Sequence, residues 1–233
     1  MDENIKREIE LYISKYPPAM KLFKELIQVG DVYIMGGLLR EYKDNNYIRE
    51  LRDADFSVKI KDQEKWIQLI KKIPNTMNRF GGYKFKYNGF IIDVWNVRET
   101  WAFRNKILDV SDDKFFEYLP KSVFLNIDAL TYDLSNNRWN DAIYKQAMLQ
   151  REIDVVLEDN PFVELNLLRA MILRRKYKMR YSAKIAQIIL NCYTSKCDFV
   201  NELLDIQFKR YGYSVLTENI IKEEIDLCKD VIF

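Results

Sequence analysis

The pattern of apolar residues predicts a short strand that turns directly into a helix near residue 36. The apolar run Val32–Met35 breaks at Gly36 and Gly37, and helical spacing resumes at Leu38. Glycine suits a tight turn because it has no Cβ atom. The first N–H groups of a helix have no partner within that helix. We therefore expect the two glycines to offer backbone N–H groups that could hold phosphate.

Two further strands are predicted to carry acidic side chains. Between Asp53 and Val58, polar and apolar residues alternate with period two, so Asp53 and Asp55 project from one face. The apolar run Phe90–Trp95 contains one acid, Asp93, which would be costly to bury without a partner. We expect Asp93 to face a cation. Because Mg²⁺ prefers oxygen ligands, the three carboxylates predict a converging site for Mg²⁺ or Mn²⁺.

Other segments of the first half predict helices and a hairpin around these strands. Apolar residues recur at helical spacing in 3–28, which a Pro-Pro pair divides, and in 62–73. Alternation of aromatic and basic residues predicts a hairpin in 80–89. We interpret 111–119 as a short helix and 123–132 as a strand. These elements predict a mixed sheet of four or five strands.

The second part of the chain has helical periodicity throughout. Helices are predicted over 142–151, 161–177, 182–193, 198–211 and 217–231. We therefore predict an α+β fold, with a head domain at 1–141 and a helical domain at 142–233.

Composition restricts the chemistry. The chain has 233 residues, 48% of them hydrophobic, which suffices for a core. Its 37 basic and 35 acidic residues give a net charge of +2, so any nucleic-acid binding must be local. The sequence has no histidine, which excludes Ser/His and Cys/His catalysis and His-ligated metals. Carboxylates must therefore supply the acid–base and metal chemistry.

The cysteines and the N-terminal segment indicate a reducing compartment. Cys192, Cys197 and Cys228 lack the paired spacing of a zinc site, so we expect buried free thiols. The first residues contain no apolar run of signal-peptide or membrane length. We expect a cytoplasmic protein that does not bind membranes. No pattern defines its oligomeric state.

The order of these motifs resembles a known superfamily. A Gly-Gly-x-x-Arg turn at 36–40, an Asp-x-Asp strand at 53–55 and the later Asp93 are similar to the head of polymerase β-like nucleotidyltransferases. Within this superfamily, the motifs resemble in particular those of bacterial poly(A) polymerases and class II CCA-adding enzymes. Segments 124–132 and 166–177 are similar to a core segment of that head and to a helix of the neck that follows.

The resemblance implies metal-dependent transfer of a nucleoside monophosphate from a nucleoside triphosphate to an acceptor hydroxyl, with release of pyrophosphate. It assigns Asp53, Asp55 and Asp93 to catalysis and metal binding, and Gly36 and Gly37 to the triphosphate. The nucleotide would lie between head and neck.

Further nucleotide contacts are implied for Arg40, Asp128 and Arg169. For Arg40, two interpretations stay equally open: a charge on the helix surface, or a functional role as a structural ion pair or a contact to triphosphate. Asp128 replaces the asparagine of the family, and could bond the nucleotide or cap a turn.

The sequence departs from the family where CCA enzymes read sugar and base. Residues 122–124 are Ser-Val-Phe instead of Arg-Arg-Asp. Glu158 and Asp159 match the neck motif Glu-Asp-x-x-Arg, but Asn166 stands in the place of its arginine. These departures argue against standard CCA addition and leave the acceptor open among RNA, a small molecule and a protein.

A dense basic stretch follows in the predicted neck. Arg174, Arg175 and Lys178 could neutralise RNA phosphates along one side of a cleft, although charged helix faces are often only solvated. Two alternatives to an enzyme stay open. One is a catalytically degenerate module that binds nucleotide or nucleic acid, and the other is an interaction module whose acids are solvated.

Overall fold

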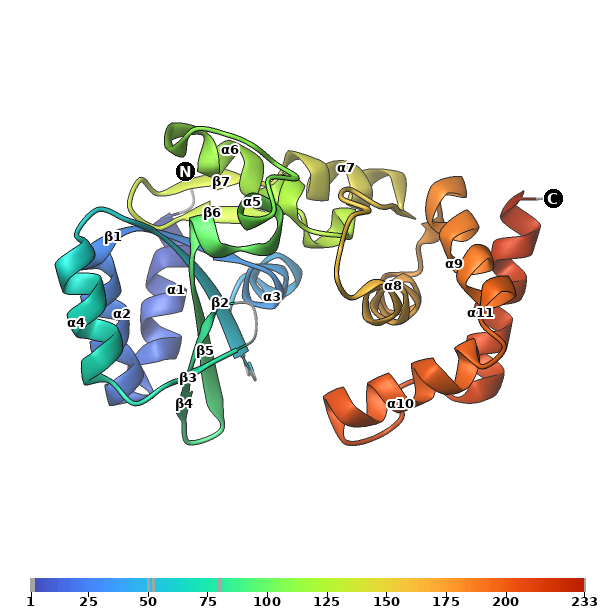
Figure 1. The fold of residues 1–233 in the computed structure, drawn as a ribbon, viewed down its shortest axis with the longest axis horizontal. Coiled ribbons are helices and arrows are strands. Elements are labelled where there is room, and N and C mark those ends of the chain that lie inside the picture. The colour runs from blue at the N-terminus through green and yellow to red at the C-terminus, as the bar shows by residue number, and fades with distance from the viewer. Residues whose placement is uncertain (1–2, 50, 52, 79–80, 233) are drawn as a thin grey trace. The chain divides into compact units, whose positions relative to one another are not determined.

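The computed structural model is an α+β fold and describes residues 3–49, 51, 53–78 and 81–232 (Figure 1). The fold class predicted from the sequence is confirmed, with a mixed sheet in the first part and helices in the second. The chain divides into two compact units. Unit 1 comprises Met1–Ser122 and Asp128–Ala142, and unit 2 comprises Val123–Ile127 and Ile143–Phe233. The segment Val123–Ile127, which the sequence analysis puts in the head, thus belongs to unit 2.

Seven strands form the sheet of unit 1 within the described residues, in the order β3-β4-β5-β2-β1-β6-β7. Among the described strands of this sheet, β2 and β5 are the only parallel neighbours, and the other adjacent pairs are antiparallel. The prediction of four or five strands was too low, because two or three residues are too few to show alternation. The strands are β1 (Gly30–Met35), β2 (Asp53–Ile60), β3 (Thr76–Met77), β4 (Tyr83–Tyr87), β5 (Phe90–Asn96), β6 (Thr131–Asp133) and β7 (Arg138–Asn140).

Helices α1, α2 and α4 lie on one face of this sheet, and the acidic residues point to the other. Helix α2 packs against α1, α4, β1 and β2 (Figure 1). The Phe23 ring of α2 lies 5.9 Å from the Phe56 ring of β2. Since side chains alternate along a strand, Asp53 and Asp55 point away from this core. The helices of unit 1 are α1 (Glu3–Ser14), α2 (Pro17–Val29), α3 (Gly37–Asn45), α4 (Gln63–Lys72), α5 (Trp101–Arg104) and α6 (Phe115–Tyr118).

A hairpin joins β4 to β5 through a two-residue turn at Asn88 and Gly89. Both residues have positive φ, 43° and 91°, which suits the Asn-Gly turns of tight hairpins. The predicted hairpin is therefore present, but its second arm is β5 rather than part of 80–89. Phe80, which the prediction included, lies outside the described residues.

The predicted strand at 123–132 is wrong for most of its length. Leu125 forms a single bridge to Val155, and the chain then makes a 3₁₀ turn over Asn126–Asp128 before β6 begins at Thr131. The Leu130 N–H donates to the Asp128 carbonyl at 2.9 Å, which interrupts the extended conformation. An apolar run alone does not reveal such a turn.

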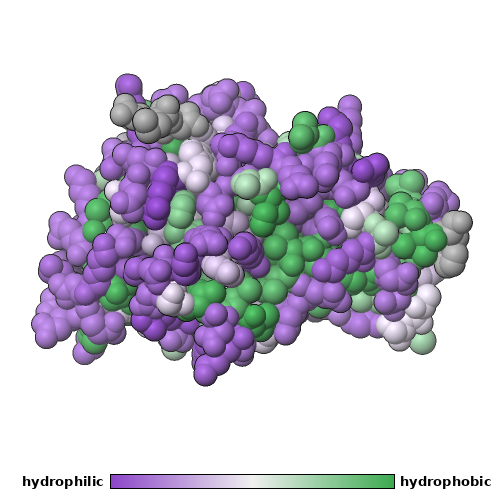
Figure 2. Space-filling model, turned by 90° about the horizontal axis from the view of Figure 1, so that it is seen from above, coloured by the Kyte–Doolittle hydropathy of each residue, from purple (hydrophilic) through white to green (hydrophobic). Residues whose placement is uncertain are grey.

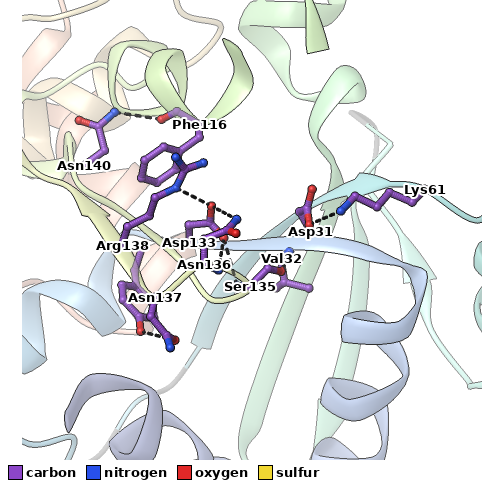
Figure 3. Close-up of polar contacts among 11 residues, drawn as sticks. Asp31, Val32, Lys61, Phe116, Asp133, Ser135, Asn136, Asn137, Arg138 and Asn140 are labelled. Atoms are coloured by element: carbon purple, nitrogen blue, oxygen red, sulfur yellow. Dashed lines mark hydrogen bonds and ion pairs between the residues drawn. The ribbon is translucent and has the colours of Figure 1, made fainter. Parts of the chain in front are cut away.

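A buried carboxylate fixes the β6–β7 hairpin (Figure 3). The Asp133 side chain is fully buried and accepts the N–H groups of Ser135 and Asn136 at 3.0 and 3.1 Å. It also accepts the Nδ2 of Asn136 at 2.8 Å and the Nε of Arg138 at 3.0 Å. The N–H of Val32 on β1 donates to the Ser135 hydroxyl at 3.4 Å. This hydrogen bond links the β6–β7 turn to β1, the strand that precedes Gly36 and Gly37.

Unit 2 is built from five helices and a short parallel strand pair in the part of the chain that the structure describes. Their bounds agree closely with the predicted helical segments. They are α7 (Ala142–Gln150), β8 (Glu152–Ile153), α8 (Val163–Tyr177), β9 (Arg180–Tyr181), α9 (Ala183–Ser195), α10 (Phe199–Tyr211) and α11 (Glu218–Ile232). Helix α7 starts at Ala142, whose contacts group it with unit 1.

The face drawn in Figure 2 is mainly hydrophilic, with hydrophobic residues in limited areas. Across the described ranges, no helix combines the length and the apolar character needed to cross a membrane. The three cysteines are free thiols. Only Cys228 is buried, whereas Cys197 is exposed and Cys192 is intermediate, so the expectation of buried thiols was wrong for Cys197.

Candidate active site

One row of residues crosses the middle of the sheet in unit 1. The strand registers pair Lys84 with Asp93, Asp93 with Asp55, and Asp55 with Met35. Directly paired residues on neighbouring strands share a face and lie close together. The row therefore brings two of the predicted acids side by side. Asp53 lies on the same face, one pleat away, opposite Ile91.

The glycine turn lies directly at the end of this row. Gly36 follows Met35 and has a φ of 75°, a backbone conformation that residues other than glycine rarely adopt. A Cβ atom at Gly36 would lie 3.2 Å from Asp55 Oδ2. Helix α3 begins at Gly37, so its first N–H groups lack intrahelical partners. The structure thus places a helix N-terminus next to the Asp55 carboxylate, as the order of the motifs suggested.

Asp93 faces a cation that belongs to the chain itself. The Nζ of Lys84 lies 2.7 Å from Asp93 Oδ2. The other oxygen of the same carboxylate, Oδ1, is buried and has no hydrogen-bond partner among the described residues. The sequence analysis expected a cation because burying a lone carboxylate costs free energy. The ammonium group of Lys84 compensates the charge of the Asp93 carboxylate.

A three-carboxylate cluster is not part of the described structure. Within the described ranges, no three cysteine or carboxylate side chains gather as a group that could hold a metal ion. The pairing of Asp93 with Lys84 gives a physical reason. Mg²⁺ commonly binds through one or two carboxylates together with substrate phosphates. Asp55 and Asp93 lie on paired positions, and Asp93 Oδ1 has no hydrogen-bond partner in the described part of the chain, so these two residues fit the smaller ligand set. The prediction that all three carboxylates converge was therefore wrong, and the candidate metal ligands are Asp55 and Asp93.

Arg40 and Asp128 form an ion pair with each other. The guanidinium Nη1 contacts Asp128 Oδ1, and the two side chains are only 13% and 9% exposed. Arg40 lies on α3, one turn after the glycine pair, and its N–H donates to the Gly36 carbonyl at 3.3 Å. Of the interpretations left open for Arg40, the structure contains the ion pair, and the side chain is mostly buried instead of lying free on the helix surface. It ties the first turn of α3 to the segment that precedes β6.

The basic residues of unit 2 have different surroundings. Arg174 forms two parallel hydrogen bonds of 2.6 Å to the fully buried Glu224, which is bidentate geometry. Arg175 is exposed and donates to Glu224 at 3.1 Å. Lys178 is exposed and ends α8 in a left-handed conformation, and Arg169 is partly buried in the middle of that helix. Arg174 therefore holds the fold of unit 2 together, and its position does not suggest a contact to RNA.

Sequence analysis missed Lys84, although a signal for it exists. The Asn-Gly turn at 88–89 fixes the hairpin register by pairing Tyr87 with Phe90. Counting outward from that pair gives Lys84 opposite Asp93. The sequence analysis instead used the alternation of aromatic and basic residues only to predict the hairpin.

Comparison with solved structures identifies the fold. No protein-family model and no curated protein matches the sequence. A CCA-adding enzyme in complex with ATP superposes with a TM-score of 0.60 at 16% identity, over 92% of this chain and 51% of the other. A CCA-adding enzyme of Thermotoga maritima in complex with tRNA gives 0.57 at 15% identity, over 92% and 52%.

A tRNA nucleotidyltransferase with a primer tRNA and an incoming ATP analogue gives a TM-score of 0.56 at 15% identity, over 87% of this chain and 59% of the other. This chain has the fold of the CCA-adding enzymes. It spans about half the length of the CCA-adding enzymes that it matches. The resemblance to polymerase β-like nucleotidyltransferases noted from the motifs is thus confirmed at the level of fold.

Proposed function

We propose that the chain is a metal-dependent nucleotidyltransferase that moves a nucleoside monophosphate from a nucleoside triphosphate to an acceptor hydroxyl. The observation that carries this proposal is the position of Asp55. Its carboxylate lies against the Gly36 turn on one side and is in register with Asp93 on the other. A phosphate-holding turn and a carboxylate pair at one point of a sheet are what nucleotidyl transfer requires.

The residues of the chain have separate tasks in this proposal. The N–H groups around Gly36 and Gly37 hold the triphosphate at the start of α3. Asp55 and Asp93 bind Mg²⁺ or Mn²⁺, and Asp53 adds a further carboxylate on the same face. A divalent cation, when bound, would neutralise charge on the phosphates and help the acceptor hydroxyl lose its proton. The acceptor oxygen then bonds to the α-phosphorus while the bond to the leaving pyrophosphate breaks.

Arg40 and Asp128 act on the nucleotide through the position of α3. Their ion pair joins the first turn of the helix to the segment that precedes β6, the strand that pairs with β1. In this proposal, Arg40 and Asp128 hold the N-terminus of α3 in the position that binds phosphate. Arg169 remains a predicted nucleotide contact. Arg175 and Lys178 stay candidates for RNA contacts because both are exposed.

RNA is the acceptor class that we propose first. The solved structures with this fold include complexes with ATP, with CTP and with tRNA. Their fold supports a nucleotide donor, and their tRNA supports an RNA acceptor. The altered sugar- and base-reading positions argue against the addition of the specific CCA sequence. We expect the reaction to take place in the cytoplasm.

One observation favours the second candidate, a degenerate module that binds nucleotide without transferring it. Lys84 already neutralises Asp93, as an internal ion pair in a site without catalytic metal would do.

The test is incubation with each labelled nucleoside triphosphate, total RNA and Mg²⁺ or Mn²⁺. We expect label to appear in RNA with the parent chain and not with Asp55→Asn. Asp109→Asn is the matched control, because Asp109 is an exposed acid of unit 1 outside the site. Nucleotide binding without transfer under every condition would favour the degenerate module.

A further inference from the structure

The Lys84–Asp93 ion pair is fixed by the backbone of the hairpin. The short turn at 88–89 sets the register, and the register puts Lys84 directly across from Asp93. The two side chains therefore share a face with Asp55, which pairs with Asp93 from the opposite strand. Asp93 thus has a cation on one side and a second carboxylate on the other.

The two partners differ in how firmly they are held. The Asp93 side chain is 13% exposed, whereas that of Lys84 is 32% exposed. A lysine reaches its partner through a flexible four-carbon chain, so the ammonium can leave for water without moving the strand. Asp93 cannot follow it. A buried carboxylate left alone would be costly, and its Oδ1 is already without a partner in the described part of the chain.

We propose that Lys84 is an internal counter-ion that competes with the divalent cation for Asp93. The proposal rests on the proposed function, since it takes Asp55 and Asp93 as the ligand pair. Without a metal, the Lys84 ammonium compensates the acid. With a metal, the ammonium turns outward, toward the face where the triphosphate would carry its negative charge. Lys84 is thus a positioning residue for the site and sets the affinity of the chain for its metal.

The competition has a measurable size. An ammonium within a few ångströms of a divalent cation raises the free energy of the bound state, so removing its charge should tighten metal binding at least about tenfold. The same removal should destabilise the metal-free protein, because Asp93 loses its partner. The metal should restore that loss. The thermal shift on adding Mn²⁺ should therefore be larger in the variant than in the parent.

The experiment measures Mn²⁺ binding by electron paramagnetic resonance, and thermal unfolding with and without Mn²⁺. The variants are Lys84→Met and Lys84→Gln, the second of which keeps a hydrogen-bond donor for Asp93 if the first folds poorly. The matched control is Lys86→Met. Lys86 is exposed on the same face of β4, but it pairs with Ile91 instead of an acid.

We expect tighter Mn²⁺ binding and a larger thermal shift in both Lys84 variants and parent values in Lys86→Met. Unchanged or weaker binding in the Lys84 variants overturns the inference, as does an equal change in the control. An Asp55→Asn arm separates the two proposals. If the parent binds Mn²⁺ through Asp55 but Lys84 variants match it, only the counter-ion role fails. If Asp55→Asn binds as the parent does, or if no variant binds, the proposed metal site fails as well.

Discussion

At the scale of single residues, the two carboxylates of β2 should matter for transfer and little for folding. Replacing Asp53 or Asp55 by Ala removes charges that repel each other and leaves the core face of β2 untouched. We expect nucleotide transfer to fall at least about 100-fold, while the free energy of unfolding changes by less than about 1 kcal/mol.

Labelled-nucleotide transfer and chemical denaturation measure the two effects on the same preparations. Transfer at the parent rate by both variants would rule out the proposed function. If either variant unfolds, the acids stabilise the fold. That result would favour the alternative in which the chain binds nucleotide or nucleic acid without transferring a nucleotide.

Gly36 should tolerate no side chain, for two independent reasons. Its φ of 75° strains any other residue, and a Cβ atom would press on Asp55 Oδ2. Gly36→Ala should cost about 1–3 kcal/mol of stability and also abolish transfer. Gly212→Ala is the matched control, because Gly212 has φ 79° and, apart from its chain neighbours, no described residue has a heavy atom within 4 Å of the added Cβ. Both variants should lose stability in denaturation, but an active Gly36→Ala enzyme would separate this turn from the reaction.

At the scale of elements, the Asp133 turn should hold the β6–β7 hairpin to the sheet. Asp133→Ala removes a buried acceptor of two backbone N–H groups and a guanidinium. We expect a loss of about 3 kcal/mol in denaturant unfolding. Arg138→Ala should cost clearly less, since that side chain is 55% exposed and water can replace it. Equal losses in the two variants would contradict the role given to the turn.

Helix α11 should protect its cysteine from alkylation. Burial, followed by the nearby Glu224, raises the pKa of the Cys228 thiol to about 12, so the reactive thiolate is scarce at pH 8. Iodoacetamide should modify the exposed Cys197 first and Cys228 only after unfolding. Mass spectrometry of the digested protein over time gives the order. Early labelling of Cys228 under native conditions would mean that α11 opens readily.

Several long elements were predictable because their buried residues recur at regular spacing on one face. Strand β5 and helices α9 and α11 show this pattern. The segment 123–132 did not, since its apolar residues are buried through a 3₁₀ turn and an isolated bridge that leave no periodic pattern.

For the candidate site, the sequence supplies the glycine pair and the acids because their chemistry is local. It does not supply their partners as directly. The Arg40–Asp128 pair joins residues far apart in the chain, and no spacing rule connects them. Lys84 is an intermediate case, because the turn at 88–89 fixes its position but the alternating pattern does not distinguish it from Lys86.

At the scale of the whole molecule, the basic residues of unit 2 should separate into two groups. Arg174→Ala leaves Glu224 buried with fewer donors and should destabilise the chain by about 3 kcal/mol. Lys178→Ala should leave stability unchanged and reduce the salt dependence of RNA binding by about one unit of slope. Filter binding over a salt series and denaturation measure these effects. If the slope of RNA affinity against salt concentration is the same in Lys178→Ala and the parent, Lys178 does not contact RNA.

The order in which the strands of unit 1 pair bears on how the chain folds. The β4–β5 hairpin is local, and such hairpins form in about 1–10 μs. The parallel β2–β5 pair joins strands separated by α4 and the hairpin, so it must close a long loop and forms later. When β5 reaches β2, Asp93 already carries the Lys84 ammonium. This later contact therefore brings Asp55 against an ion pair instead of a bare like charge, and we expect removal of Lys84 to slow this step of folding.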